Sequence, residues 1–180
     1  WYRDDEGKIH KNAQSPLIDI NKYPPDFSLF EESRFIRTMG GEIFKTVPIE
    51  TYRGCPFACT FCVWGISALS KIQVFSMERV KADLDYVTQY GSNFPQLVFA
   101  DANFGILKRD VEIAKHIRKV WEDSRAFASI EIYWSKSAQD YMVEIGRVLG
   151  CLTNTYIAFQ SLDDNVLESI KRKNISTERL

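Results

Sequence analysis

The sequence predicts an α/β fold built around a parallel β-sheet. After about residue 40, short apolar runs that suit β-strands alternate with longer segments whose apolar residues recur at helical spacing. Strands separated by helices of this length pair in parallel through right-handed crossover connections. The chain has 180 residues, of which 45% are hydrophobic and 26% charged. We therefore expect a folded chain that buries one substantial core.

The first part of the chain, residues 1–40, is expected to be a loop-rich lead-in or linker. Pro16, Pro24 and Pro25 interrupt regular structure, and the polar stretch 3–8 leaves room for at most a short hairpin. This segment is either a plain linker or a contact with a substrate or partner. Residues 41–180 are expected to form the α/β core.

The first strand is expected at residues 43–51, where β-branched and aromatic residues are frequent. Pro48 weakens this prediction locally, because proline donates no hydrogen bond to a sheet. The first helix is expected to begin after Ser76, which can cap it, and to end at Gly91. Its apolar face comprises Met77, Val80, Leu84 and Val87.

Three further βα units follow in the same pattern. Strands are expected at residues 96–100, 128–133 and 155–159, and helices at residues 108–123, 138–149 and 164–172. Functional side chains of parallel α/β folds gather at the carboxyl ends of the strands. We therefore expect a site built from four segments that follow the strands: residues 52–62, 101–105, 134–137 and 160–161.

The first of these segments contains three cysteines within a stretch of eight residues: Cys55, Cys59 and Cys62. Closely spaced thiolates are soft ligands that suit iron–sulfur clusters, zinc or copper(I). A cubane cluster held entirely by protein needs four cysteines, so three leave one iron open to a small molecule. An open coordination position distinguishes reactive metal sites from closed structural ones.

Other uses of these cysteines are less favoured. Disulfides do not suit such short spacings in a cysteine-poor chain. A structural zinc site needs a fourth ligand, and Cys151, His10 and His116 are remote in sequence. Cys151 lies in the apolar stretch 148–152, so we expect it to be a buried small hydrophobe.

The spacing CxxxCxxC after a strand, with the aromatic Phe61 before the third cysteine, resembles the signature of the radical S-adenosylmethionine (radical SAM) superfamily. The resemblance implies that Cys55, Cys59 and Cys62 bind a [4Fe-4S] cluster whose open iron is chelated by S-adenosylmethionine. Reductive cleavage of that cofactor then yields a 5′-deoxyadenosyl radical, which abstracts a hydrogen atom. It also implies a partial parallel (β/α) barrel, here truncated to about four βα units and incomplete at its C-terminal end.

The segment after the second strand resembles the "DxNFG…RD" stretch of the cobalamin-linked radical SAM subgroup, in place of a Gly-Gly-Glu-type motif. The resemblance implies that Asp101 and Asn103 contact S-adenosylmethionine. The alternative is that Asp101 caps a turn and residues 103–105 only reverse the chain. Arg109 and Asp110 are expected to begin the following helix, where an acidic side chain suits the helix dipole.

The resemblance implies three further contacts with S-adenosylmethionine, from Phe61, Ser135 and Gln160. In the family the backbone at the position of Phe61 approaches the adenine. Ser135 offers a hydroxyl beside Lys136, which is either a cation near the cofactor or a surface lysine at a helix start. The stretch 170–174 is expected to be a solvated helix end; it also resembles a family pattern that gives Arg172 a structural role near the cofactor.

The function implied is that of a cobalamin-linked methyltransferase, in which a substrate radical takes a methyl group from methylcobalamin bound by a domain outside this chain. Two alternatives stay open. One is a radical SAM enzyme without cobalamin, of methylthiotransferase or dehydrogenase type. The other is a non-catalytic iron–sulfur electron-transfer module. A fragment with an unclosed sheet edge is expected to be inactive, or weakly active, alone.

The partners implied by the resemblance are a small-molecule or peptide substrate and an electron donor such as flavodoxin or ferredoxin. The net charge of −1 gives no reason to expect nucleic acid or an anionic membrane as a partner. No apolar run approaches the roughly 18 residues that a membrane-spanning helix needs. A reducing cytoplasm, where an oxygen-sensitive thiolate site survives, is the expected location.

Overall fold

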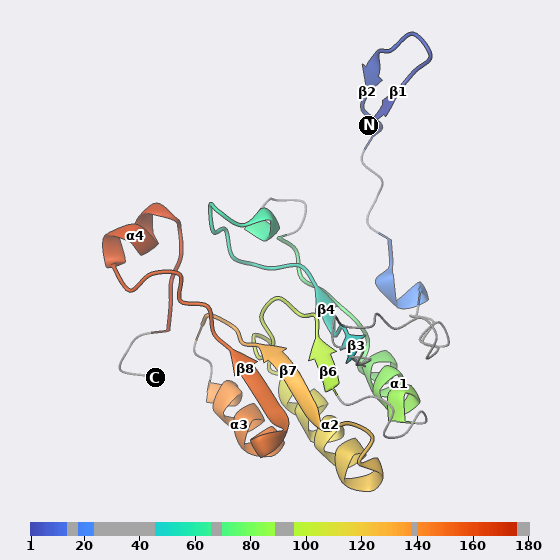
Figure 1. The fold of residues 1–180 in the computed structure, drawn as a ribbon, viewed down its shortest axis with the longest axis vertical. Helices are drawn as coiled ribbons and strands as arrows, with labels where there is room; N and C mark the ends of the chain where they lie inside the picture. Colours follow the sequence, from blue (N-terminus) through green and yellow to red (C-terminus); the bar gives the residue numbers. More distant parts are fainter. Residues whose placement is uncertain (14–17, 24–45, 66–69, 89–95, 138–139, 176–180) are drawn as a thin grey trace, which may run out of the picture.

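A computed structural model describes residues 1–13, 18–23, 46–65, 70–88, 96–137 and 140–175 (Figure 1). Its centre is a sheet of four strands: β3 (Thr46–Ile49), β6 (Gln96–Phe99), β7 (Ser129–Tyr133) and β8 (Thr153–Tyr156). Their order in the sheet is their order in the chain, and every neighbouring pair is parallel. The predicted α/β class with a parallel sheet is therefore confirmed.

The register of the sheet brings the strand ends together. Ile49 pairs with Phe99, and Tyr133 pairs with Tyr156. Pro48 is tolerated because β3 lies at one edge of this sheet, where a missing N–H donor costs no ladder hydrogen bond. The segments that follow the four strands therefore all begin at the same side of the sheet, where the carboxyl ends of the strands lie; we call this side the carboxyl edge.

Three helices lie side by side along one face of the sheet: α1 (Met77–Thr88), α2 (Asp110–Ser124) and α3 (Asp140–Leu149) (Figure 1). The backbone N–H of Arg79 donates to the hydroxyl of Ser76 at 3.2 Å, which confirms Ser76 as the cap of α1. The predicted helix 164–172 is shorter: α4 (Asp164–Ser169) ends where Lys171 adopts a left-handed φ of 52°. The N–H of Arg172 then bonds the carbonyl of Leu167 at 2.9 Å, as in a Schellman helix end.

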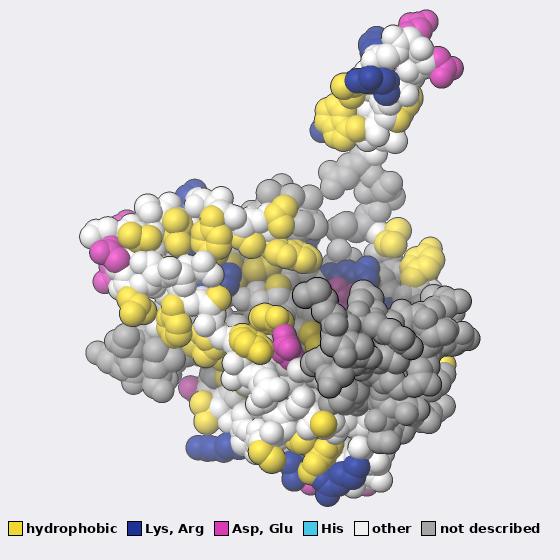
Figure 2. Space-filling view, in the orientation of Figure 1, with side chains coloured by type: hydrophobic (Ala, Val, Ile, Leu, Met, Phe, Trp, Pro, Cys, Tyr) yellow, Lys and Arg dark blue, Asp and Glu magenta, His cyan; other side chains and the backbone are white. Residues whose placement is uncertain are grey.

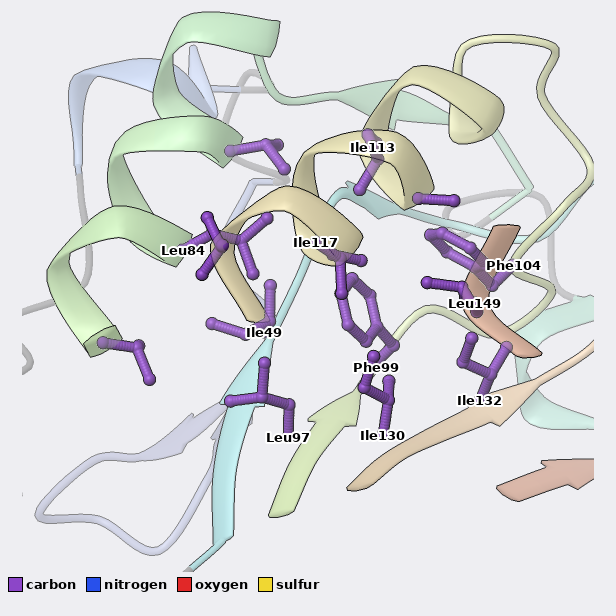
Figure 3. Packing of buried hydrophobic residues seen from close by; sticks show 14 of the residues in the cluster. Ile49, Leu84, Leu97, Phe99, Phe104, Ile113, Ile117, Ile130, Ile132 and Leu149 are labelled. Atoms are coloured by element: carbon purple, nitrogen blue, oxygen red, sulfur yellow. The ribbon is translucent and has the colours of Figure 1, made fainter. Parts of the chain in front are cut away.

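The hydrophobic core lies between the sheet and these helices (Figure 3). Alternate residues of β3, β6 and β7 point inward, as the pattern of burial along these strands shows. They meet the apolar stripes predicted for the helices, and the rings of Phe99 and Phe104 pack at 5.0 Å. The central members of the core are Ile49, Leu84, Leu97, Ile113, Ile117, Ile130, Ile132 and Leu149.

The opposite face of β7 and β8 is more open. The rings of Tyr133 and Tyr156 stack there at 5.5 Å, and both side chains are about half exposed. Figure 2 shows apolar side chains on the surface around β8 and α4. The exposed apolar residues of this region are Tyr133, Tyr156, Ile157, Leu162 and Val166.

Several details differ from the prediction. A short antiparallel pair, β4 (Tyr52–Arg53) with β5 (Gln73–Val74), brackets the cysteine segment, where only a loop was expected. The strand predicted at 155–159 lies at Thr153–Tyr156 instead. Cys151 is exposed rather than buried. It lies in the 3-10 turn η6 (Gly150–Leu152). Leu149, at the end of α3, and Leu152 take the inward positions and leave Cys151 facing solvent.

The lead-in contains a short hairpin of β1 (Tyr2–Arg3) and β2 (Ile9–His10), as predicted, followed by a 3-10 turn η1 (Ile20–Lys22). The expected boundary between residues 40 and 41 lies outside the described residues, as does the predicted end of the first helix at Gly91. In the described part of the chain, no helix is long and apolar enough to cross a membrane.

Candidate functional site

The cysteine segment leaves the carboxyl end of β3, as predicted, and runs from β4 to the 3-10 turn η4 (Val63–Gly65). Gly54 turns the chain at φ 101°, a conformation that side-chain-bearing residues rarely adopt. Cys55 and Cys59 are each 3% exposed, whereas Cys62 is partly exposed. All three are free thiols, so this loop presents three sulfur atoms beyond the carboxyl end of β3.

Asp101, two residues after the end of β6, holds the start of this loop in place. Its carboxylate is 1% exposed and accepts hydrogen bonds from the backbone N–H of Thr51 at 2.9 Å and of Tyr52 at 3.0 Å. The Thr51 hydroxyl donates a third, at 2.9 Å. In return, the hydroxyl of Tyr52 accepts the backbone N–H of Asn103 at 2.7 Å. The exits of β3 and β6 are therefore held by bonds in both directions.

Burial dominates the electrostatics of this contact. It raises the pKa of Asp101 to about 7, against the opposing effect of the three donors. Burial, with the nearby Asp101 carboxylate, also raises the pKa of Tyr52, so its phenol stays neutral. The alternative prediction is that Asp101 caps a turn. Its carboxylate does accept backbone N–H groups, but these belong to the segment that follows β3 and not to its own segment after β6. A contact between Asp101 and S-adenosylmethionine stays a prediction.

Asn103 lies beside the first cysteine of the loop. Its side chain is 1% exposed, and its Nδ2 donates to the Sγ of Cys55 at 3.2 Å. Its Oδ1 is buried and has no hydrogen-bond partner among the described residues. A buried acceptor without a donor is costly. Asn103 therefore offers one acceptor to a bound molecule while its other end contacts sulfur.

Gly105 and Asp110 shape the rest of this segment. Gly105 has φ 83°, and a Cβ there would come within 3.0 Å of the Met142 and Trp134 side chains. Asp110, the first residue of α2 as predicted, is fully buried and accepts the N–H groups of Gly105 at 2.9 Å and Leu107 at 3.1 Å. Burial raises the pKa of Asp110 to about 6. The segment is thus held by buried hydrogen bonds to Asp110 and by close packing around Gly105.

The exit of β7 runs beside the exit of β6. The Ser135 N–H donates to the carbonyl of Phe104 at 3.0 Å, and the buried Ser135 hydroxyl lies 3.0 Å from that of Ser137. The next residue, Lys136, places its Nζ 3.7 Å from the Sγ of Cys59 and 4.8 Å from the ring centroid of Phe57. Lys136 is therefore part of the candidate site. Its contact with Cys59 joins residues 77 positions apart, which no local sequence pattern indicates.

The exit of β8 is held by side chains from beyond α4. Asn174 donates to the carbonyls of Phe159 and Ser161, both at 2.9 Å, and Arg172 donates to that of Ala158. Gln160, between them, is exposed and adopts a left-handed φ of 66°. The backbone N–H of Thr60 also donates to the carbonyl of Ile170 at 3.1 Å, which joins the cysteine loop to this region.

Arg172 is only 5% exposed, so the predicted solvated helix end is wrong at this position. Its Nε also donates to the side chain of Asn174 at 2.8 Å. These bonds hold the segment that follows β8, which ends at Tyr156 and not at the predicted residue 159. The other predicted contact, Phe61, is 52% exposed in the cysteine loop, and its role stays a prediction.

The structure brings the predicted segments to one edge of the sheet, but it does not gather the three sulfurs around one point. Within the described ranges, no group of three or more His, Cys, Asp or Glu side chains is close enough to hold a metal ion. The donor set itself suits an iron–sulfur cluster. The loop contains three free thiols, and the sulfurs of Cys55 and Cys59 each face an N–H donor, as sulfur ligands of clusters often do.

Comparison with known proteins identifies relatives of the chain, although no family model matches it. It is 36% identical over 132 residues to the 2-(S-pantetheinyl)-carbapenam-3-carboxylate methyltransferase of Streptantibioticus cattleyicolor, covering 72% of this chain and 19% of that protein. It is 33% identical over 132 residues to the cobalamin-dependent radical SAM methyltransferase TokK of Streptomyces tokunonensis, with the same coverage of 72% and 19%. The chain thus spans about a fifth of the length of both relatives.

A solved structure shares the fold. The cobalamin-dependent S-adenosylmethionine radical enzyme OxsB, with aqua-cobalamin and S-adenosylmethionine bound, superimposes with a TM-score of 0.66 at 18% identity. The match covers 99% of this chain and 26% of that enzyme. The four parallel strands with their helices therefore correspond to part of that enzyme's fold, consistent with the predicted partial barrel.

Proposed function

Because the chain is related in sequence to cobalamin-dependent radical SAM methyltransferases and shares the fold of such enzymes, we propose that it is the part of a methyltransferase that binds a [4Fe-4S] cluster and S-adenosylmethionine. The observation that carries the proposal is the loop of three free cysteines at the carboxyl edge of a parallel sheet. This is the edge at which α/β enzymes perform chemistry.

Cys55, Cys59 and Cys62 would hold the cluster. When bound, the cluster supplies the electron for reductive cleavage of S-adenosylmethionine, and cobalamin on a domain outside this chain supplies the methyl group. The residues of this chain would bind the cluster and hold the cysteine loop in position. Asp101 and Tyr52 fix the start of the loop, and the Thr60 bond to Ile170 holds its middle.

The contacts proposed for S-adenosylmethionine come from the strand exits. The unpaired Oδ1 of Asn103 can accept a hydrogen bond from an ammonium or hydroxyl group, and the buried hydroxyl of Ser135 can donate or accept. Gln160 and Phe61 are exposed at the same edge and are available to a ligand. Asp101 remains a proposed contact, although its carboxylate oxygens already accept three hydrogen bonds.

The proposed partners are a small-molecule or peptide substrate and an electron donor such as flavodoxin or ferredoxin. The relationship to TokK, a cobalamin-dependent radical SAM methyltransferase, favours methyl transfer with cobalamin over radical SAM chemistry without it. A non-catalytic electron-transfer module is the alternative from another class.

Anaerobic reconstitution with iron and sulfide tests the proposal. We expect the wild-type protein to bind iron and sulfide in equal amounts. When this chain is part of the longer protein with its cobalamin domain, it should also release 5′-deoxyadenosine from S-adenosylmethionine on reduction. Substitution of Cys55, Cys59 or Cys62 by alanine should abolish both. Cys151→Ala is the matched control, because this thiol is exposed in η6 and outside the cysteine loop.

Two other results would overturn the proposal. Binding of one zinc ion in place of iron would indicate a structural metal site. A stable cluster that never cleaves S-adenosylmethionine, in the protein with its cobalamin domain present, would indicate electron transfer.

A further inference from the structure

We propose that Asn103 and Lys136 donate hydrogen bonds to two cluster ligands, Cys55 and Cys59, and thereby raise the reduction potential of the cluster. The inference rests on the proposed function, since it assumes that these cysteines bind a cluster. It assigns a positioning and tuning role to two side chains from different strand exits.

Two hydrogen bonds hold Asn103 in place, one from its backbone and one from its side chain. Its backbone N–H is held by the Tyr52 hydroxyl at 2.7 Å, and its Nδ2 reaches Cys55 Sγ at 3.2 Å. Both Asn103 and Cys55 are almost fully buried. A hydrogen bond out of water is stronger than an exposed one, because the local dielectric constant is lower. The amide therefore has a fixed orientation with its NH2 group toward sulfur.

The contact of Lys136 adds a positive charge. Its ammonium group lies between the Cys59 sulfur, at 3.7 Å, and the face of the Phe57 ring, whose centroid is 4.8 Å away. An ammonium over an aromatic face is attracted by the ring, so Phe57 helps to hold the cation in place. Within the described part of the chain, the sulfur of Cys62 accepts no side-chain hydrogen bond, so the three ligands differ.

The two donors should act in the same direction. Hydrogen bonds and positive charge withdraw electron density from thiolate ligands and favour the reduced cluster, which carries one more negative charge. A full charge interacts more strongly than an amide dipole. Lys136 is therefore expected to have the larger effect, and Asn103 a smaller effect of the same sign.

The midpoint potential of the reconstituted protein, titrated without S-adenosylmethionine and followed by electron paramagnetic resonance, tests this inference. We expect Lys136→Met to shift the redox equilibrium about tenfold toward the oxidised cluster, which is about 59 mV more negative for a one-electron couple. Asn103→Leu should shift it less, in the same direction. Lys136→Arg should keep most of the wild-type potential, because it keeps the charge and a donor.

Lys119→Met is the matched control. Lys119 lies on α2 and pairs with Asp123 at 2.7 Å, so its loss removes the same charge without removing a contact to sulfur. We expect no shift in this variant. Wild-type potentials in both Lys136→Met and Asn103→Leu would overturn the inference, as would an equal shift in Lys119→Met.

A second measurement needs no variant. Pulsed electron paramagnetic resonance of the reduced wild-type cluster should detect coupled protons that disappear after exchange into deuterium oxide, because Nδ2–H and Nζ–H protons exchange. Their absence would overturn the inference even if a variant failed to fold. If the coupled protons are absent but the cluster still forms and cleaves S-adenosylmethionine, the proposed function is retained. If the wild type fails to bind iron, both the inference and the proposed function are refuted.

Discussion

The carboxylate of Asp101 accepts two hydrogen bonds from Thr51, one from its backbone N–H and one from its hydroxyl, both at 2.9 Å. The two residues are 50 positions apart and lie at the exits of neighbouring parallel strands. Since Cys55 follows four residues after Thr51, this contact determines where the cysteine loop begins. A carboxylate predicted to bind a cofactor thus serves the loop that is proposed to hold the cluster.

Asp101→Ala should destabilise the protein by about 3 kcal/mol, because an unpaired buried donor costs roughly 1–3 kcal/mol and two backbone N–H groups lose their acceptor. Asp101→Asn should stay within about 1 kcal/mol of wild type at neutral pH. Its amide oxygen can accept both N–H groups while its NH2 donates to the Thr51 hydroxyl. Urea denaturation of the cluster-free protein measures both values, and equal losses in the two variants would contradict the role of these bonds.

The contribution of Asp101 to the stability of the protein should decrease as the pH rises from about 4 to about 7. The pKa of Asp101 is raised from 3.8 to about 7 in the folded chain, mainly by burial. Between these values the unfolded chain has released the proton that the folded chain keeps, so raising the pH favours unfolding. Asp110, with a pKa raised to about 6, adds to the same trend.

The Asp101→Asn variant isolates the contribution of Asp101 to the pH dependence of stability. Relative to wild type, this variant should gain stability between about pH 5 and about pH 8 and show no further relative change above that. Denaturant unfolding at the two pH values gives the comparison. Parallel profiles for the variant and the wild type would show that Asp101 does not titrate in this range.

Gly105→Ala should destabilise the protein by about 2 kcal/mol or more, because a left-handed conformation alone costs a residue with a Cβ roughly 1–2 kcal/mol. The added Cβ would also come within 3.0 Å of Met142 and Trp134. Gly146→Ala is the matched control in α3, where a Cβ meets nothing within 4 Å. It should stabilise the helix by about 0.5–1 kcal/mol. Thermal unfolding distinguishes the two, and a neutral Gly105→Ala would contradict the described turn.

Arg172→Met should loosen the exit of β8, because it removes the bonds to the Ala158 carbonyl and to Asn174. We expect a loss of about 2 kcal/mol, since the Ala158 carbonyl and the Asn174 side chain both lose a charged, largely buried donor. Limited proteolysis should then cleave faster near residues 158–161. Arg147→Met, at an exposed position of α3, should change neither property, and an equal effect of both variants would refute the role of Arg172.

The order of the βα units could be predicted from the sequence because it depends on local patterns. The apolar stripe of α2 and the alternation along β6 repeat within a few residues, and burial follows them directly. The position of the site followed as well, since the carboxyl ends of parallel strands share one edge. The cap Ser76 and the helix start at Asp110 are equally local.

What could not be predicted depends on residues distant in sequence. Lys136 contacts Cys59 across 77 positions, and Arg172 and Asn174 bond to the carbonyls of Ala158 and Phe159 from 14 and 15 residues downstream. The error at Cys151 has another cause. An apolar neighbourhood predicts burial on average, but the 3-10 turn after α3 buries Leu149 and Leu152 and leaves both residues between them, Gly150 and Cys151, exposed.

Electron paramagnetic resonance of the reduced, reconstituted protein, recorded with and without S-adenosylmethionine, tests the central claim most directly. If an open iron in the cysteine loop binds S-adenosylmethionine, the reduced-cluster signal shifts when S-adenosylmethionine is added, is lost in Cys59→Ala and is unchanged in Cys151→Ala. A cluster signal that does not respond to S-adenosylmethionine would contradict the claim that this site binds that cofactor at an open iron.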